Sequence, residues 1–113
     1  MFEIAIEVAF SVKSGGGGIC VLGRVGKGPV HVGDAVIFKT PSREFRSVIS
    51  GLEKDRQIVE SAKEGDDVGI LFRNITQDQL SECLVMDGQH YRVSGLRLIS
   101  APGLPKRWWE FWK

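Results

Sequence analysis

A hydrophobic period of two residues dominates this chain and most limits what it can fold into. Every second residue from Phe2 to Val12 is large and apolar, which is typical of a strand that buries one face. Shorter extended runs follow between glycine, proline and aspartate residues: "ICVLGRV", "AVIFK", "FRSVISGLEK", "VGILFR", "CLVM" and "HYRVSGLRLIS". Short strands at such close spacing predict an all-β fold closed as a barrel.

The segments between these runs are mostly turns. "SGGGG" (14–18) is expected to be a hairpin turn between the first two strands. Residues 55–65, "DRQIVESAKEG", carry a helical signal that is too short to be convincing. "TQDQL" is more typical of one helical turn, because Thr76 stands at the cap and Gln79 follows three residues later.

The length and charge of the chain narrow its class. The 113 residues are enough for one domain with one modest core. The net charge is only +1, and it is unevenly spread: residues 1–91 carry 10 Lys/Arg and 13 Asp/Glu, net −3, whereas residues 92–113 are net +4. A nucleic-acid-binding domain should gather basic residues on one face, so the predicted barrel is a poor candidate.

The expected location is the cytoplasm. We see no basic and apolar leader at the N-terminus, and no apolar run approaches the ~20 residues of a membrane span. Cys20 and Cys83 lie far apart in the sequence and are expected to be free, buried thiols in a reducing compartment.

The motifs of the common catalytic classes are missing from the sequence. The glycines of "SGGGGICVLG" are not followed by the Lys-Ser/Thr of a phosphate-binding loop, so we expect no nucleotide binding. His31 and His90 cannot be tied to Cys20 or Cys83 as a catalytic pair, and the close-spaced ligands of a zinc site are lacking. We therefore expect no catalytic residues, no metal and no cofactor.

The order of these signals resembles one known family. A strand ending in "VAFSV", a Gly-rich turn, "GRVGKGPVHVGD", a strand, "VISGLEKDRQIVESAKEGDDVGILFRNI", a helical turn and "LVM" resemble the second domain of translational GTPases, of the elongation factor Tu type. The resemblance covers residues 2–86. It implies a closed antiparallel Greek-key barrel of six to seven strands over residues 1–100. Beyond it, the prolines of "APGLPK" indicate a linker, so residues 101–113 are expected to be a linker and an aromatic tail.

The resemblance also gives a role to the charged corner in "EGDDVGILFRNI" (64–75). In the family this corner is a turn that starts an interior strand. Gly65 is then expected to take a backbone conformation that other residues resist, and Asp66 to hydrogen-bond its own turn. Val68, Ile70 and Phe72 should alternate with Gly69, Leu71 and Arg73.

Three residues match or replace family positions of functional interest. In elongation factor Tu, this barrel helps hold the aminoacylated end of transfer RNA, using a Glu-Asp pair on the first strand and an Asn before the fifth strand's Val-Gly. Glu7 matches the Glu, whereas Val8 and Asp67 replace the Asp and the Asn. Glu7, Asp67 and the motif-matching Arg73 are the family-derived candidate binding residues; a solvated, outward-facing Glu7 is the simpler interpretation.

The C-terminal "KRWWEFWK" departs from the family pattern. Its four aromatic residues are the candidate partner-binding residues: Trp108, Trp109, Phe111 and Trp112. Each offers roughly 150–250 Å² of mostly apolar surface that is costly to leave in water. The open alternatives are packing on the barrel, binding a partner or a second copy, insertion into a membrane interface, and stacking on single-stranded nucleic acid.

These observations favour a protein that is not an enzyme. The first hypothesis is a non-catalytic module that binds a protein partner through the side of the barrel and the aromatic tail. The alternative is a translation accessory that binds transfer or ribosomal RNA, which the net negative barrel argues against. A bacterial immunity protein is a remote third hypothesis.

Overall fold

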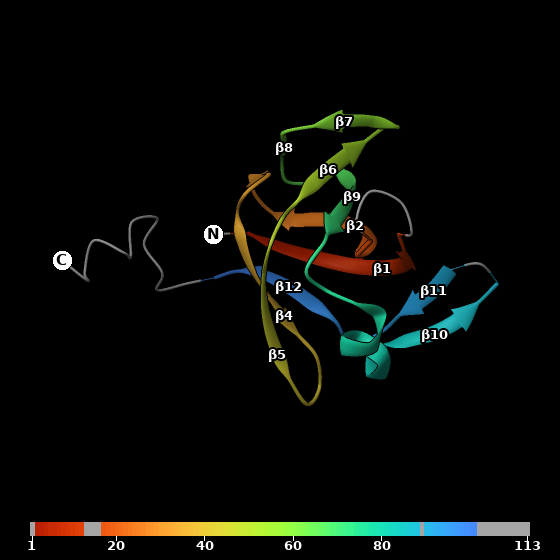
Figure 1. Cartoon of the computed structure of the whole chain (residues 1–113). Coiled ribbons are helices and arrows are strands. Elements are labelled where there is room, and N and C mark those ends of the chain that lie inside the picture. Colours follow the sequence, from red (N-terminus) through yellow and green to blue (C-terminus); the bar gives the residue numbers. More distant parts are fainter. Residues whose placement is uncertain (1, 13–16, 89, 102–113) are drawn as a thin grey trace.

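The computed structural model describes residues 2–12, 17–88 and 90–101, which form an antiparallel β structure with one short helix (Figure 1). The strands are β1 (Glu3–Ser11), β2 (Ile19–Lys27), β3 (Val30–His31), β4 (Ala35–Lys39), β5 (Glu44–Val48), β6 (Gly51–Lys54), β7 (Gln57–Val59), β8 (Ser61–Ala62), β9 (Asp67–Phe72), β10 (Leu84–Asp87), β11 (His90–Val93) and β12 (Arg97–Ser100). A 3-10 helix, η1 (Gln77–Cys83), separates β9 from β10. The predicted all-β class is confirmed.

One large sheet carries most of the structure. Eight of its strands follow the order β5-β4-β12-β1-β2-β9-β6-β7, the β10–β11 hairpin joins it through β1, and β3 pairs separately with β8. β5 and β6 lie far apart in this order, although only Ile49 and Ser50 separate them in the chain. The chain therefore changes partner at these two residues, since β5 pairs with β4 and β6 with β9.

The hydrophobic core lies on the inner side of this curved sheet. Phe38 of β4 and Phe72 of β9 are both fully buried, and their rings meet edge to face with centroids 4.5 Å apart. β12, β1 and β2 separate these two strands in the sheet, so the sheet must curl until strands that are not neighbours share one core. The other large, fully buried side chains belong to Ile4, Ile19, Val21, Val25, Val30, Ile49, Ile70, Ile75, Leu80 and Leu98.

The alternation predicted for the first strand is wrong beyond Ile6. Phe2, Ile4 and Ile6 are buried as expected, but Ala9 is then fully buried whereas Val8 is only partly so. The cause is a bulge: Ile6 lies opposite Gly23 and Val8 opposite Leu22, which leaves Glu7 as an extra residue. An extra residue reverses the inside-outside phase of all that follows.

Three other segments also differ from the sequence prediction. The single strand expected at 45–54 is two strands, because the chain changes pairing partner between them. The strand expected at 90–100 is also divided, into β11 and β12, which pair with different parts of β1. Residues 55–65, with their weak helical signal, contain β7 and β8 instead, because pairing with β6 and β3 outweighs a short helical pattern.

The predicted helical turn is confirmed at η1. The backbone N–H of Thr76 donates to Gln79 Oε1 at 2.9 Å, and Leu80 and Cys83 anchor the turn in the core. Within the described ranges, no helix has the length and apolar character needed to cross a membrane.

The contact between β1 and β2 yields a stability prediction. A Cβ added to Gly23 would lie 2.0 Å from the carbonyl oxygen of Ala5, so Gly23→Ala would force the paired backbones apart. We expect a loss of at least about 3 kcal/mol in the free energy of unfolding, measured by urea denaturation.

Gly26→Ala, on the same strand, is the matched control. Its added Cβ would meet only the Glu3 carbonyl oxygen, at an ordinary 3.5 Å, so we expect a change within about 0.5 kcal/mol. Equal effects of the two substitutions would contradict the proposed close contact at Gly23.

Candidate functional site

A surface cleft of about 590 Å³ opens on the outer face of β1, β2, β6 and β9. Its size falls in the roughly 300–1,000 Å³ range of ligand and side-chain pockets. The lining residues are Ala5, Glu7, Phe10, Cys20, Leu22, Gly23, Arg24, Glu53, Asp55, Arg56, Asp67, Val68 and Gly69.

The register of the strands explains why a hollow forms here. Leu22 of β2 lies opposite Gly69 of β9, which in turn lies opposite Glu53 of β6. A Cβ on Gly69 would lie 3.1 Å from Leu22 Cδ2 and 3.9 Å from Glu53 Cβ. Gly69 contributes no side chain at this position, so the Leu22 side chain and Cys20 Sγ lie close over its backbone.

The bulge in β1 places Glu7 at this cleft. As the extra residue between Ile6 and Val8, it faces solvent and lines the hollow. Bulges re-aim side chains next to many functional sites. The simpler interpretation, a solvated and outward-facing Glu7, thus agrees with its exposure. In addition, Glu7 lines the cleft.

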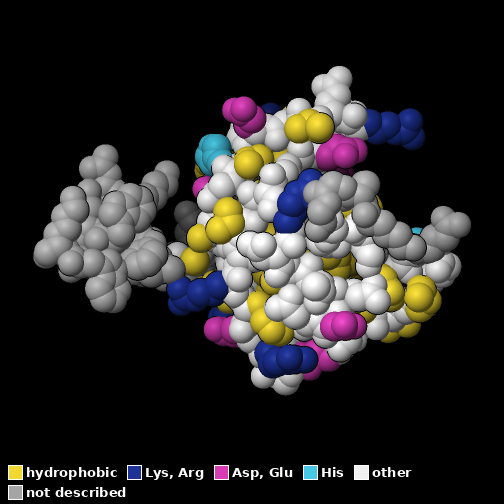
Figure 2. Space-filling view, viewed as in Figure 1, with side chains coloured by type: hydrophobic (Ala, Val, Ile, Leu, Met, Phe, Trp, Pro, Cys, Tyr) yellow, Lys and Arg dark blue, Asp and Glu magenta, His cyan; other side chains and the backbone are white. Residues whose placement is uncertain are grey.

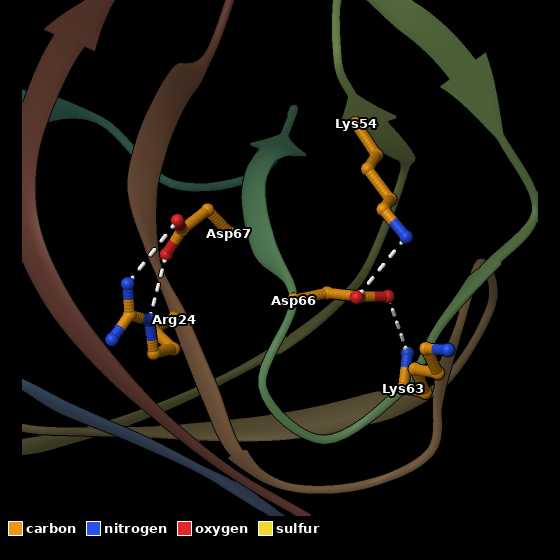
Figure 3. A network of polar contacts seen from close by, with 5 residues as sticks. All are labelled: Arg24, Lys54, Lys63, Asp66 and Asp67. Carbon is orange, nitrogen blue, oxygen red and sulfur yellow. Dashed lines mark hydrogen bonds and ion pairs between the residues drawn. The ribbon is translucent and has the colours of Figure 1, made fainter.

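Asp67 forms an ion pair across the cleft with Arg24. Arg24 Nε donates to Asp67 Oδ1 at 2.9 Å, and Nη2 donates to Oδ2 at 3.3 Å (Figure 3). These hydrogen bonds and the guanidinium charge lower the pKa of Asp67 below its usual range. Both side chains are exposed, so the pair fixes geometry more than it adds stability.

Asp66, the neighbouring acid, faces the other way and holds the corner together. The Lys63 backbone N–H donates to Asp66 Oδ2 at 2.9 Å, and Lys54 Nζ lies 3.0 Å from Oδ1 (Figure 3). Gly65 has φ of +91°, a conformation that favours glycine. The structural roles predicted for Gly65 and Asp66 are therefore confirmed.

The rim of the cleft is acidic. Four carboxylates line the cleft, against the guanidinium groups of Arg24 and Arg56: Glu7, Glu53, Asp55 and Asp67. The lining charge is therefore −2, and the pairing of Arg24 with Asp67 leaves three acids facing one arginine. Such a surface attracts cationic groups and repels phosphate.

Two residues of the rim, Asp55 and Arg56, lie in a tight hairpin turn. Asp55 and Arg56 join β6 to β7 with φ of +52° and +65°, as in the two-residue turns that match strand twist. Positive φ is tolerated by Asp but is uncommon for Arg. The turn fixes where both charged side chains leave the backbone.

Cys20 lies in the cleft as a half-buried thiol. Burial and the negative charge of Glu53 raise its pKa to about 11, so the thiol is neutral at physiological pH and a poor nucleophile. Burial also raises the pKa of Cys83, which is packed in the core. Both cysteines are free, as predicted, but Cys20 is less buried than expected.

The described residues include no group of three or more His, Cys, Asp or Glu side chains placed to hold a metal ion. The lining of the cleft combines charged side chains with apolar ones. Binding by ion pairing and packing is the chemistry that these groups support.

The structure brings together two of the three family-derived candidates. Glu7 and Asp67 both line the cleft, whereas Arg73 follows the far end of β9 and donates from Nη1 to the Gly17 carbonyl at 3.3 Å. The aromatic candidates lie outside the described residues: Trp108, Trp109, Phe111 and Trp112.

Sequence reasoning missed most of the cleft lining, including Leu22, Glu53 and the Asp55-Arg56 turn. The available signal was the alternation of inward- and outward-facing residues along β2 and β9, which would place Arg24 and Asp67 on the outer face of the sheet. That signal is useful only when the pairing of the two strands is known.

No protein family model matches the chain.

The pKa of Cys20 predicts a low and pH-dependent reactivity. With a pKa of about 11, about one thiol in a thousand is ionised at pH 8, so alkylation by iodoacetamide should be slow and should accelerate up to about pH 11. Glu53→Gln removes a charge that opposes ionisation and should increase the rate at fixed pH several-fold. Peptide mass spectrometry measures the modification at Cys20, and Glu60→Gln, outside the cleft, is the control. Equal rates in both variants would contradict the role of Glu53.

Asp66 predicts an acid-dependent loss of stability. Its pKa is lowered first by the Lys63 N–H bond and then by Lys54, so its contribution is present above the unfolded-state pKa near 3.8 and is lost as pH falls through the lower folded-state value. Asp66→Asn should lower the Tm by several degrees at pH 7, and the difference from wild type should shrink below pH 4. Thermal melts at both pH values measure this, with Glu60→Gln at an exposed position as the control. A difference that persists unchanged in acid would show that charge is not the cause.

Proposed function

We propose that this chain is a non-catalytic binding module, a solitary barrel of the translation-factor domain 2 type that binds a protein partner at the acidic cleft. The observation that carries the proposal is the cleft itself, an open hollow with an apolar floor and a net negative rim. The cytoplasm remains the proposed location.

Two topological facts support a closed barrel. β5 and β6 are joined by two residues, yet β5 pairs with β4 and β6 with β9. If β5 and β6 are counted as one bent strand, the order β4-β12-β1-β2-β9 returns to its own start. Such a ring has six strands, within the predicted range, and it leaves few free sheet edges.

The position of the cleft supports a relationship to domain 2. Glu7 and Asp67, which the resemblance placed in an amino-acid-binding pocket, do meet in one hollow. Their surroundings differ in chemistry, since Asp67 accepts both hydrogen bonds from Arg24. We propose that the surface now recognises a cationic side chain of a protein, because Glu7, Glu53 and Asp55 outnumber the remaining Arg56.

The RNA-binding alternative is less well supported. Lys/Arg and Asp/Glu side chains are interspersed on the face seen in Figure 2, rather than gathered into a basic stripe. The cleft would also present three carboxylates to a phosphate backbone. We retain transfer or ribosomal RNA as an outcome of the test below.

The proposal that the module is not an enzyme is supported by the ionisation of the cleft groups. The pKa of Cys20 is raised to about 11 and that of Asp67 is lowered. Both shifts move the group away from a pKa near neutrality, which a general acid or base requires. The aromatic residues at 108–112 remain a proposed second part of the interface.

Affinity capture from a lysate of the source cells, with and without nuclease, tests this function. The full chain is compared with Glu7→Lys/Glu53→Lys, which reverses two cleft charges, and with Glu60→Lys/Asp78→Lys, which reverses two exposed charges elsewhere. We expect a protein that resists nuclease and is captured by wild type and control, with recovery reduced at least about tenfold by the cleft variant.

Two results would contradict the proposal. Recovery unchanged by the cleft variant would remove the cleft from the interface. Recovery of RNA or ribosomal components that nuclease abolishes would favour the translation accessory instead.

A further inference from the structure

We propose that the cleft is occupied by residues 106–113 of the same chain, "KRWWEFWK", which fold back onto the outer face of β1, β2 and β9. This inference goes beyond the proposed function, because it concerns what fills the cleft before any partner arrives. It rests on charge, apolar surface and reach, each visible in the sequence or the described residues.

The charges of the cleft and the segment are opposite and equal. The segment carries Lys106, Arg107 and Lys113 against Glu110, net +2. The cleft lining has four carboxylates and two guanidinium groups, net −2. Arg24 and Asp67 already satisfy each other, so the acids left to meet a cation are Glu7, Glu53 and Asp55. Opposed charges of this kind guide the docking and fix its register.

The apolar surfaces also match. Leu22 is 39% exposed at the cleft although its strand neighbours on the inner side are buried. Phe10 and Ala5 line the same hollow, and Gly69 contributes no side chain to fill it. The segment brings three indoles and one phenyl ring, which gain the most from leaving water. An indole seated against Leu22 would cover exposed apolar area in the cleft.

The chain between β12 and the segment is long enough. Ala101 follows β12, in which Ile99 lies opposite Glu3 and Arg97 opposite Ala5, so Ala101 lies near the start of β1. The middle of the cleft is about six residues further along β1 and two strands across from β12, or roughly 20–25 Å at ~3.3 Å per residue and ~4.8 Å per strand. Residues 102–108 span up to about 25 Å when extended, which brings Trp108 to the cleft.

A second hollow lies along this path. It has a volume of about 350 Å³ and is lined by residues of β1, the end of β2 and the start of β12, and it shares Ala5 with the first cleft. Both hollows border on Ala5, which lies between the side of β12 and Leu22. Residues 102–105 would cross this second hollow.

Attachment favours the chain's own segment over that of a second copy. A short tether gives an effective concentration in the millimolar range, well above the concentration of free protein in a micromolar solution. The consequence is competition: a partner that uses cationic or aromatic side chains at the cleft must first displace residues 106–113. The released aromatic residues would then be available to the partner.

Intrinsic fluorescence tests the inference in the full chain, because all three tryptophans of the protein lie in this segment: Trp108, Trp109 and Trp112. We expect the emission of the folded chain to be blue-shifted, and its acrylamide quenching constant to be at least about two-fold lower, relative to a synthetic peptide of residues 106–113. Both values should be constant from 0.5 to 50 µM protein, the range over which association between copies would change them.

Glu7→Lys/Glu53→Lys reverses two cleft charges and should shift the docked-to-free equilibrium about tenfold, moving emission and quenching towards those of the peptide. Leu22→Asn, which removes an apolar side chain without changing the charge of the cleft or the tail, should act in the same direction. Glu60→Lys/Asp78→Lys, with the same charge change outside the cleft, should leave the signal unchanged. Far-ultraviolet circular dichroism checks that each variant is folded.

Three results would overturn the inference. Wild-type fluorescence equal to that of the peptide would show that the segment is in water. Protected fluorescence that is indifferent to both cleft variants would place the segment elsewhere on the protein. Protection that grows with protein concentration would assign the cleft to a second copy. None of these results depends on capture of a cellular partner, so failure here and failure of the proposed function are distinguishable.

Discussion

The close contact between β1 and β2 at Gly23 is the constraint on which the rest of the structure depends. The carbonyl oxygen of Ala5 occupies the space that any side chain at Gly23 would need. Directly after this contact, Glu7 is inserted as a bulge, and the strand exchanges its inner and outer residues. Ala9 then enters the core, while Phe10 and Val8 turn partly outwards. The bulge at Glu7 thus decides both which β1 side chains enter the core and which line the cleft.

The two aspartates of the charged corner have different roles: Asp66 stabilises the turn, and Asp67 contributes to the charge of the cleft. Asp66 precedes β9 and Asp67 is its first residue, and their side chains leave the backbone in different directions (Figure 3). Asp66 accepts from the turn behind it and pairs with Lys54, which fixes the entry into β9. Asp67 is held by Arg24 on the outer face. Because Arg24 and Asp67 neutralise each other, the other charged groups of the cleft, Glu7, Glu53 and Asp55 with Arg56, leave it net negative.

We propose that the cleft is a surface for recognition. Its apolar floor is small, its rim is charged, and its one thiol is neutral because burial and Glu53 oppose ionisation. Apolar contact supplies binding energy and the carboxylates supply orientation, as in many protein interfaces. A segment that combines cationic and aromatic side chains fits both requirements. The chain itself carries one such segment at 106–113, the proposed occupant of the cleft.

The sequence by itself determined the strand class, the turn at Gly65 and Asp66, the capped turn at Thr76 and the alternation of β9, because each depends on neighbours within a few residues. For the tail, the sequence showed a cluster of aromatic residues but not where in the fold they lie. The tertiary structure decided the bulge at Glu7, the division of residues 44–54 between two partners and the assembly of the cleft. These depend on which strands pair and in which register: Gly69 becomes a floor only because Leu22 and Glu53 stand on either side of it. Local periodicity records which way a side chain points, but only the pairing of distant strands decides what it meets.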